Sequence, residues 1–147
     1  LNTMYSFGRL RPSNPFIGGF VHEGIDFGTF KRFKNTQTAV YSIMISDEQY
    51  NRLNQIIHKV EATSQEYKFN FIGLVAVALH MKIQRRRAFY CAEFVKYAMK
   101  KAQIRNNLPD IVKPEDFLNL ENIRLEYKGA LKQYKVEELP TLNVANL

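Results

Sequence analysis

The pattern of apolar and polar positions predicts two strands in the first third of the chain. Thr3 to Arg9 is a short β-prone run that stops at a Pro/Ser/Asn cluster, Pro12 to Pro15, so a strand is expected to run into a loop there. Ala39 to Ile45 is apolar on both alternating faces, as in the interior of a sheet. The segment between them, Phe16 to Lys34, is rich in glycine and phenylalanine and is predicted to be a long loop folded over the core.

Helical spacing of apolar residues begins directly after the second strand. Ser46 to Gln49 has the form of a capping box, in which the serine accepts from the third amide and the glutamine reaches back. The apolar stripe of this helix consists of Leu53, Ile56, Ile57 and Val60. His58 lies off the centre of the stripe, so we expect it at the rim or exposed. A second, mostly buried helix is predicted over residues 70–81.

A third helix carries the single cysteine of the chain. It is predicted to begin near Phe89 or Tyr90, and its lysines, such as Lys96, point away from the core. The thiol belongs to the apolar stripe and is therefore expected to point inward. That stripe comprises Cys91, Phe94, Val95, Ala98 and Ala102.

The last third of the chain is expected to add a short helix and a closing hairpin. Pro114 stands where a first helical residue belongs, with acidic residues in the turn after it. Ile123 to Tyr127 and Leu131 to Val136 resemble two strands joined around Lys128-Gly129. No repeat or linker interrupts the sequence, so a single α+β domain over residues 1–147 is predicted.

Composition narrows the classes of protein to which the chain can belong. With 46% hydrophobic and 24% charged residues, the chain lies in the ordinary globular range. Its longest apolar stretch, Phe69 to Leu79, is too short to span a bilayer. One cysteine excludes an internal disulfide, and His22, His58 and His80 stand too far apart for a zinc motif. No metal and no cofactor is therefore expected.

The net charge of +7 bears on partners and location. Basic residues cluster at Lys31 to Lys34 and at Lys82 to Arg87, which suits anionic lipid, so contact with a membrane surface is one expectation and a cell-wall polymer another. A solvated basic face is the simpler interpretation, and no nucleic acid is favoured because no nucleic-acid motif accompanies the charge. The first residues do not resemble a signal peptide, and a cytoplasmic location is the expectation for the chain as it stands.

Cys91 is the residue with the clearest chemical use. A thiol in the first turn of a helix lies at the positive end of the helix dipole, and that position favours the thiolate. The amides of the same turn can donate to an oxyanion when an acyl group is attacked. The alternative is a small core residue, because free cysteine is often buried. Glu93 lies roughly 200° around the helix from Cys91 and is expected to bond a neighbouring loop.

Two strings of residues resemble a known family. Phe69 to Leu74 reads Phe-Asn-Phe-Ile-Gly-Leu, and after a basic turn Phe89 to Val95 reads Phe-Tyr-Cys-Ala-Glu-Phe-Val. This order of residues is similar to the pattern found in the circularly permuted branch of the NlpC/p60 superfamily, the YiiX-like papain-type proteins. The resemblance implies a papain-like fold in which an antiparallel sheet packs on helices.

The resemblance also assigns roles to residues of this chain. It makes Cys91 the nucleophile, and its helix amides part of the oxyanion site. In that family the base is a histidine on a strand preceding the one that matches Thr3 to Arg9, so we expect an N-terminal truncation that lacks the base and is inactive. The polar residue that orients the histidine would fall on Ser6. His22, beside Glu23 in the sequence, is the internal alternative for the base.

Three functions remain open at this point. A thiol hydrolase would form an acyl-enzyme from an amide or ester, with a peptide, a cell-wall component or a lipid-type acyl substrate, and an LRAT-like lipid acyltransferase is a variant of it. A catalytically silent binding or structural module with the same fold is the alternative. A basic nucleic-acid binder is the least supported. A homodimer is a further expectation, because an open sheet edge can pair two chains.

Overall fold

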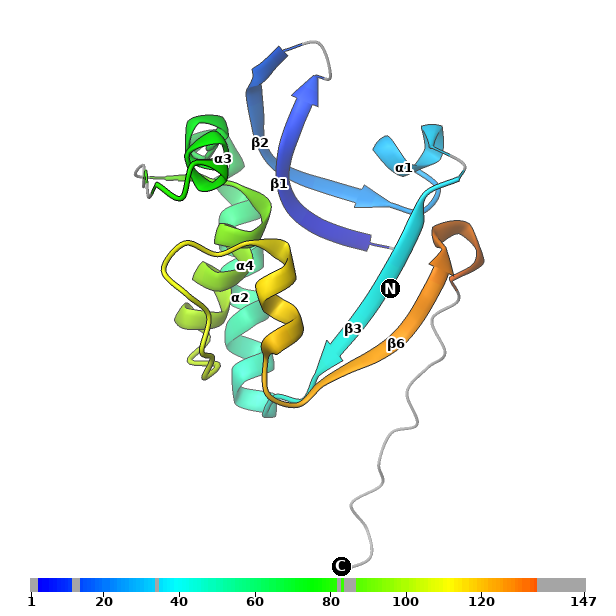
Figure 1. Ribbon diagram of the computed structural model, residues 1–147, viewed down its shortest axis with the longest axis vertical. Helices are drawn as coiled ribbons and strands as arrows, with labels where there is room; N and C mark the ends of the chain where they lie inside the picture. The colour runs from blue at the N-terminus through cyan, green and yellow to red at the C-terminus, as the bar shows by residue number, and fades with distance from the viewer. Residues whose placement is uncertain (1–2, 12–13, 34, 82, 84–86, 135–147) are drawn as a thin grey trace, which may run out of the picture.

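The computed structural model describes residues 3–11, 14–33, 35–81, 83 and 87–134. The architecture combines helices with small antiparallel sheets, so the predicted mixture of helix and strand is present. Figure 1 shows the helices α2, α3 and α4 on one side of the molecule and the strand pair β3–β6 on the other. No helix among the described residues is long and apolar enough to cross a membrane.

The strands form three separate pairs. An antiparallel hairpin joins β1 to β2, and a second antiparallel pair joins β3 to β6, while β4 and β5 make a short parallel pair. In the described part of the chain, β1 pairs only with β2 and β3 only with β6, so one edge of each is open. The bounds are β1 Thr3–Arg11, β2 Asn14–Gly24, β3 Gln37–Ile43, β4 Lys68–Phe69, β5 Ala88–Phe89 and β6 Ile123–Ala130.

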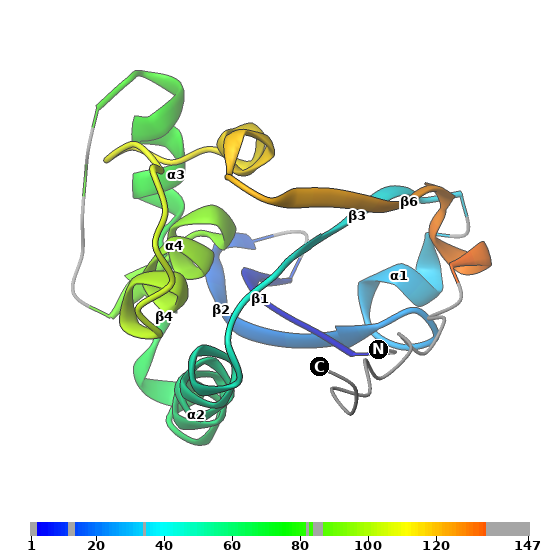
Figure 2. The same cartoon turned by 90° about the horizontal axis from the view of Figure 1, so that it is seen from below.

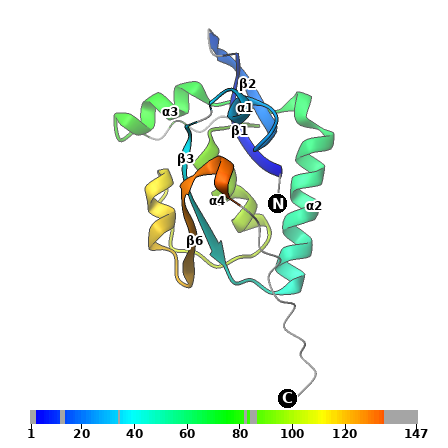
Figure 3. The same cartoon turned by 90° about the vertical axis from the view of Figure 1, so that its right-hand side faces the viewer.

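Helices lie on both sides of the hairpin β1–β2, with α1 against β2 and α4 against β1. Figure 3 shows α2 running along one side, while α3 lies near the end of the molecule from which the hairpin tip projects. The bounds are α1 Thr29–Arg32, α2 Asp47–Ala62, α3 Phe71–Ala78 and α4 Cys91–Lys101, with 3₁₀ helices at Ser64–Glu66, Pro114–Asn119 and Leu131–Gln133.

The predicted long loop over residues 16–34 is wrong, because most of its first half is strand β2. Glycines permit this strand to lie close to its neighbours. A Cβ added at Gly18 would stand 2.4 Å from the carbonyl oxygen of Gly8 and 2.6 Å from the Cβ of Phe69. The glycines therefore mark close backbone approach inside a sheet, which sequence reading confused with loop composition.

The prediction of an interior strand at residues 39–45 and that of a closing hairpin are also wrong. β3 has an open edge and leaves Tyr41 40% exposed. Its only partner in the described residues is β6, a single strand that continues through Gly129 to Ala130, so no turn forms there. Leu131 begins a 3₁₀ turn, and the end of the predicted hairpin at Val136 lies outside the described residues.

Helix α2 forms as predicted, whereas helix α3 is more exposed than predicted. The capping box is present in α2, with both reciprocal bonds between Ser46 and Gln49, and His58 is 71% exposed as expected. Helix α3 was expected to be mostly buried, and this is wrong. Its Ala76 and Val77 face the core, but Ile72, Leu74 and Val75 are 40% or more exposed.

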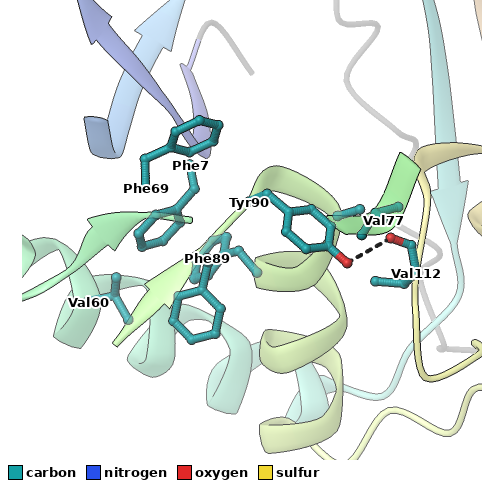
Figure 4. Packing of buried hydrophobic residues seen from close by; sticks show 9 residues of the cluster. Phe7, Val60, Phe69, Val77, Phe89, Tyr90 and Val112 are labelled. Carbon is teal, nitrogen blue, oxygen red and sulfur yellow. Dashed lines mark hydrogen bonds between the residues drawn. The ribbon is translucent and has the colours of Figure 1, made fainter. Parts of the chain in front are cut away.

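The core is centred on Phe7 of β1. This side chain is 2% exposed, and its ring lies within 4.9–6.1 Å of the rings of four aromatic residues. Figure 4 shows Phe7, Phe69 and Phe89 gathered between the strands and helices. The core thus ties the hairpin β1–β2 to the beginning of α4. The four rings belong to Phe20, Tyr67, Phe89 and Phe94.

Candidate functional site

Cys91 is the first residue of α4 and so lies in the first turn, as predicted, although the helix begins after the expected start near Phe89 or Tyr90. Tyr90 is the N-cap residue, with extended backbone angles, and its carbonyl oxygen accepts the first helical bond from the amide of Phe94 at 3.0 Å. The cysteine is exposed, so the expectation that its thiol points into the core is wrong. Side chains of a helix lean toward its N-terminus, so the side chain at the first position extends beyond the packed turns.

The thiol lies on the side of α4 that meets the hairpin β1–β2. Cys91 shares a helix face with Phe94 and Val95, three and four residues further on. The Phe94 ring packs on Phe7 of β1 at 4.9 Å and on Phe20 of β2 at 5.8 Å. The first turn of α4 is therefore held beside β1, with the cysteine at its exposed end.

The amino end of α4 offers amides for a developing negative charge. Tyr90 makes no side-chain capping bond, and the amides of Cys91 and Ala92 lie in the first turn, where a helix has no internal acceptor for them. The hydroxyl of Tyr90 instead donates to the carbonyl oxygen of Val112 at 3.0 Å (Figure 4). Burial, assisted by the charge of Glu93, raises the pKa of Tyr90 above its usual value of 10.0. The phenol therefore remains a donor at neutral pH and fixes the start of the helix.

Asn70 connects the start of α3 to the start of α4. The side chain is fully buried, and its oxygen caps α3 by accepting from the amide of Gly73 at 2.9 Å. Its amide group donates to the carbonyl oxygen of Ile83 at 3.2 Å and to Oε2 of Glu93 at 3.4 Å. Glu93 thus accepts from the side chain of Asn70, the N-cap residue between β4 and α3, which agrees with the expected bond to a neighbouring loop. The position of α4 is fixed two residues after the cysteine.

The two family-like strings are joined in space. Phe69 of β4 pairs with Phe89 of β5, and the backbone amide of Asn70 donates to the carbonyl oxygen of Phe89 at 2.8 Å. Gly73 is required by the same arrangement, because a Cβ there would stand 2.1 Å from Nδ2 of Asn70. The Asn-x-x-Gly string therefore has a structural role next to the cysteine helix.

Ser6 lies on the face of the hairpin that is turned away from α4. Side chains alternate along a strand, and Phe7 contacts α4 while Ser6 lines a hollow with Val21 and with Phe30 of α1. The structure therefore does not bring Ser6 to the side on which Cys91 lies. Its predicted role as an orienting residue finds no support in this placement.

His22 lies on the same face of the hairpin as Tyr5, which stacks on its ring at 4.8 Å. The edge of Phe27 approaches the ring at 5.5 Å, and Nδ1 stands 3.8 Å from Oε1 of Glu61 at the end of α2. The acidic side chain beside His22 is thus Glu61. Glu23, its neighbour in the sequence, instead accepts a hydrogen bond from the amide of Thr29. Sequence reading missed Glu61, since nothing links positions so distant in the chain. These contacts do not join His22 to Cys91.

An apolar groove lies between the two antiparallel pairs, and sequence reading did not predict it. It encloses about 330 Å³, and Phe94 and Val95 in its wall stand one turn after Cys91. Strand β1 contributes Tyr5 to it, and β3 contributes Tyr41 and Ile43. Figure 2 shows that the pair β1–β2 is separate from the pair β3–β6. The other main contributors are Leu53, Ile57, Ala98, Met99 and Ile123.

Comparisons with protein-family models, with curated proteins and with solved structures find no match to this chain. Within the described residues, no three histidine, cysteine or acidic side chains converge as metal ligands. The chemistry that can be assigned therefore depends on the exposed thiol, the helix end that carries it and the groove that begins one turn further along α4.

Proposed function

We propose that this chain is a papain-like thiol hydrolase domain in which Cys91 attacks an amide or ester carbonyl. The observation that carries the proposal is the exposed thiol at the first residue of α4, held beside β1 by the packing of Phe94 on Phe7. A core cysteine would be covered, and this one is accessible to an acyl group. The amides of the first turn supply donors to the oxyanion.

The reaction would proceed through an acyl-enzyme. The sulfur of Cys91 bonds to the carbonyl carbon, the carbon–nitrogen or carbon–oxygen bond breaks, and the thiol proton passes through a base to the leaving amine or alcohol. Water then attacks the thioester and restores the thiol. The groove whose wall includes Phe94 and Val95, one turn after Cys91, is apolar on most of its walls, which suits a substrate or a strand with apolar side chains.

The base is proposed to stand on a strand that pairs with the open edge of β1. Of the three described histidines, His22 contacts Tyr5, Phe27 and Glu61, His58 lies on the exposed side of α2, and His80 is exposed in the turn after α3. β1 and β3 each have one open edge and each contributes to the groove, so an added strand could pair with β1 on that side. The family resemblance likewise expects a histidine-bearing strand in this part of the fold.

The experiment supplies the base from solution. The chain is incubated with an activated acyl ester, with and without imidazole, and acylation of Cys91 is followed by mass spectrometry and ester cleavage by absorbance. We expect slow acylation without imidazole, faster cleavage with it, and loss of both above background in Cys91→Ala. Cys91→Ser is the size-matched control and should retain little of the activity, since a hydroxyl is a poorer nucleophile without a strong base.

Two other outcomes would favour either His22 as the base or a binding module without catalytic activity. A fast reaction without imidazole that disappears in His22→Gln would identify His22 as the base. Absence of acylation at Cys91 under both conditions would contradict the proposal and favour a silent binding module of the same architecture.

A further inference from the structure

The two antiparallel pairs of strands contribute to one apolar groove, although they do not pair with each other. Among the described residues, β1 pairs only with β2 and β3 only with β6, and no backbone hydrogen bond from another element reaches either strand. Tyr5 of β1 and Tyr41 of β3 both lie in the wall of the groove. An open edge presents a row of backbone donors and acceptors that can pair with another strand. The described structure thus has two such rows, on two strands that share one apolar hollow.

The composition of the strands indicates which of them are built as outer edges of a sheet. A strand edge that faces water normally carries charged residues or proline, which prevent pairing with other chains. β6 carries Arg124, Glu126 and Lys128, whereas β3 has no charged residue and no proline. β1 likewise has neither from Thr3 to Gly8, while its partner β2 contains a proline and an acidic residue. β2 and β6 are therefore protected as edges, and β1 and β3 have the composition of strands that lie between two neighbours.

Two hollows next to β1 offer room for the side chains of an added strand. Tyr5 lines the apolar groove of about 330 Å³, and it also lines a second hollow of about 620 Å³. The second hollow lies between the hairpin and α1, and its walls include Ser6 and Phe30. Successive side chains of a strand point to opposite faces of a sheet. A strand added next to β1 can therefore place alternate side chains in the groove and in the second hollow.

We propose that a separate extended peptide strand inserts between β1 and β3 and joins the two pairs into one sheet, in the order β2, β1, added strand, β3, β6. Its backbone pairs with both open edges, and its apolar side chains at alternate positions fill the groove. A small apolar ligand can also fill the groove, but it leaves both rows of backbone groups unpaired. The proposal concerns the partner of the two open strands, and it holds whether or not that strand carries a base for Cys91.

The test is titration of the full chain with a synthetic peptide of nine residues, the length of β1. The peptide alternates valine with threonine and has lysine at both ends, which limits its own aggregation. Calorimetry gives the affinity, and hydrogen exchange with mass spectrometry locates the site. We expect saturable binding and slower exchange of amides in β1 and β3 together. A peptide of the same composition with its valines grouped at one end should bind about tenfold more weakly, because its apolar side chains cannot all lie on one face.

Methylation of the peptide backbone distinguishes a strand that bridges both pairs from one that pairs on one side only. In a strand, the amides of successive residues point to opposite neighbours. N-methyl groups on the odd positions of the peptide therefore remove the donors on one edge, and N-methyl groups on the even positions remove those on the other. We expect each set to weaken binding by about tenfold or more, because β1 and β3 take opposite edges of the peptide.

Tyr41→Glu tests the groove side of the site, and Tyr50→Glu is the matched control. Tyr41 is 40% exposed and lines the groove, whereas Tyr50 is 57% exposed on α2 and is not part of it. Tyr41→Glu should weaken peptide binding by about tenfold, because it places a charge against apolar side chains. Tyr50→Glu changes the net charge by the same amount and should leave the affinity unchanged. Circular dichroism verifies that both variants are folded.

Several results would overturn the proposal. These are absence of binding by the alternating peptide, sensitivity to one set of N-methyl groups only, protection of β1 without β3, or equal effects of Tyr41→Glu and Tyr50→Glu. A chain that is dimeric before the peptide is added and monomeric afterwards would instead make a second copy the occupant of the two edges. All of these measurements can be repeated on Cys91→Ser, so this proposal and the proposed hydrolase function can fail separately.

Discussion

Asn70 offers the sharpest test of how the start of α4 is held in place. Replacing it with alanine removes the cap on Gly73 and the two bonds donated to Ile83 and Glu93. Replacing it with aspartate keeps an oxygen that can cap α3, but it removes the amide donor and brings a carboxylate up to Glu93. The pair of variants therefore separates the cap from the link to α4.

The expected magnitudes follow from the bonds that are lost. A lost N-cap costs about 1 kcal/mol, and two long donated bonds, one of them to a carboxylate, add about 2 kcal/mol. Asn70→Ala should therefore lower the free energy of unfolding by about 3 kcal/mol. Asn70→Asp should lose at least as much at pH 7, because two carboxylates would face each other in a site that is fully buried at Asn70.

The assay is urea unfolding followed by circular dichroism at pH 7 and at about pH 4. Asn70→Asp should recover part of its stability at the lower pH, since one protonated carboxyl can donate to the other, whereas Asn70→Ala should show no such recovery relative to the unsubstituted chain. An Asn70→Asp variant as stable as the unsubstituted chain at pH 7 would refute the reasoning, because it would mean that only the cap matters.

Three further predictions concern the same core. Gly73→Ala should destabilise despite the better helix propensity of alanine, because its Cβ would meet Asn70, and combining it with Asn70→Ala should cost less than the sum of the two in a double-mutant cycle. Phe7→Ala should lower the free energy of unfolding by about 3–5 kcal/mol in denaturant titration. The raised pKa of Tyr90 means that its contribution is complete below pH 10 and is lost as pH rises above 10 through the folded-state value. Tyr90→Phe should therefore lose less stability than the unsubstituted chain does as pH rises above 10.

The sequence predicts correctly those elements that depend on residues close together in the chain. The capping box at Ser46 and Gln49 and the start of the cysteine helix at Cys91 depend on residues a few positions apart, and the structure contains both. β2 was missed because its glycines serve contacts with Gly8 and Phe69, which the sequence does not reveal.

Long-range pairing explains the remaining errors. β3 and β6 are more than seventy residues apart, so the pairing of Ile43 with Ile123 leaves no pattern that a reader of one sequence can recognise. The residues of the candidate site also differ in how far the sequence can predict their positions. The position of Cys91 could be predicted from its helix, whereas the side of the hairpin on which Ser6 lies and the contact of His22 with Glu61 depend on packing between distant segments.

The central claim is that the fold exposes the thiol of Cys91 at the amide-rich end of a helix. The most direct test is the rate of alkylation by iodoacetamide at neutral pH and low salt, with mass spectrometry of the labelled peptide, in the folded chain and in the same chain unfolded in urea. The account predicts a rate about two- to fivefold higher in the folded chain, the effect expected of a helix amino end on an exposed anion. A folded chain in which Cys91 is protected from the reagent, and reacts only after unfolding, would contradict it.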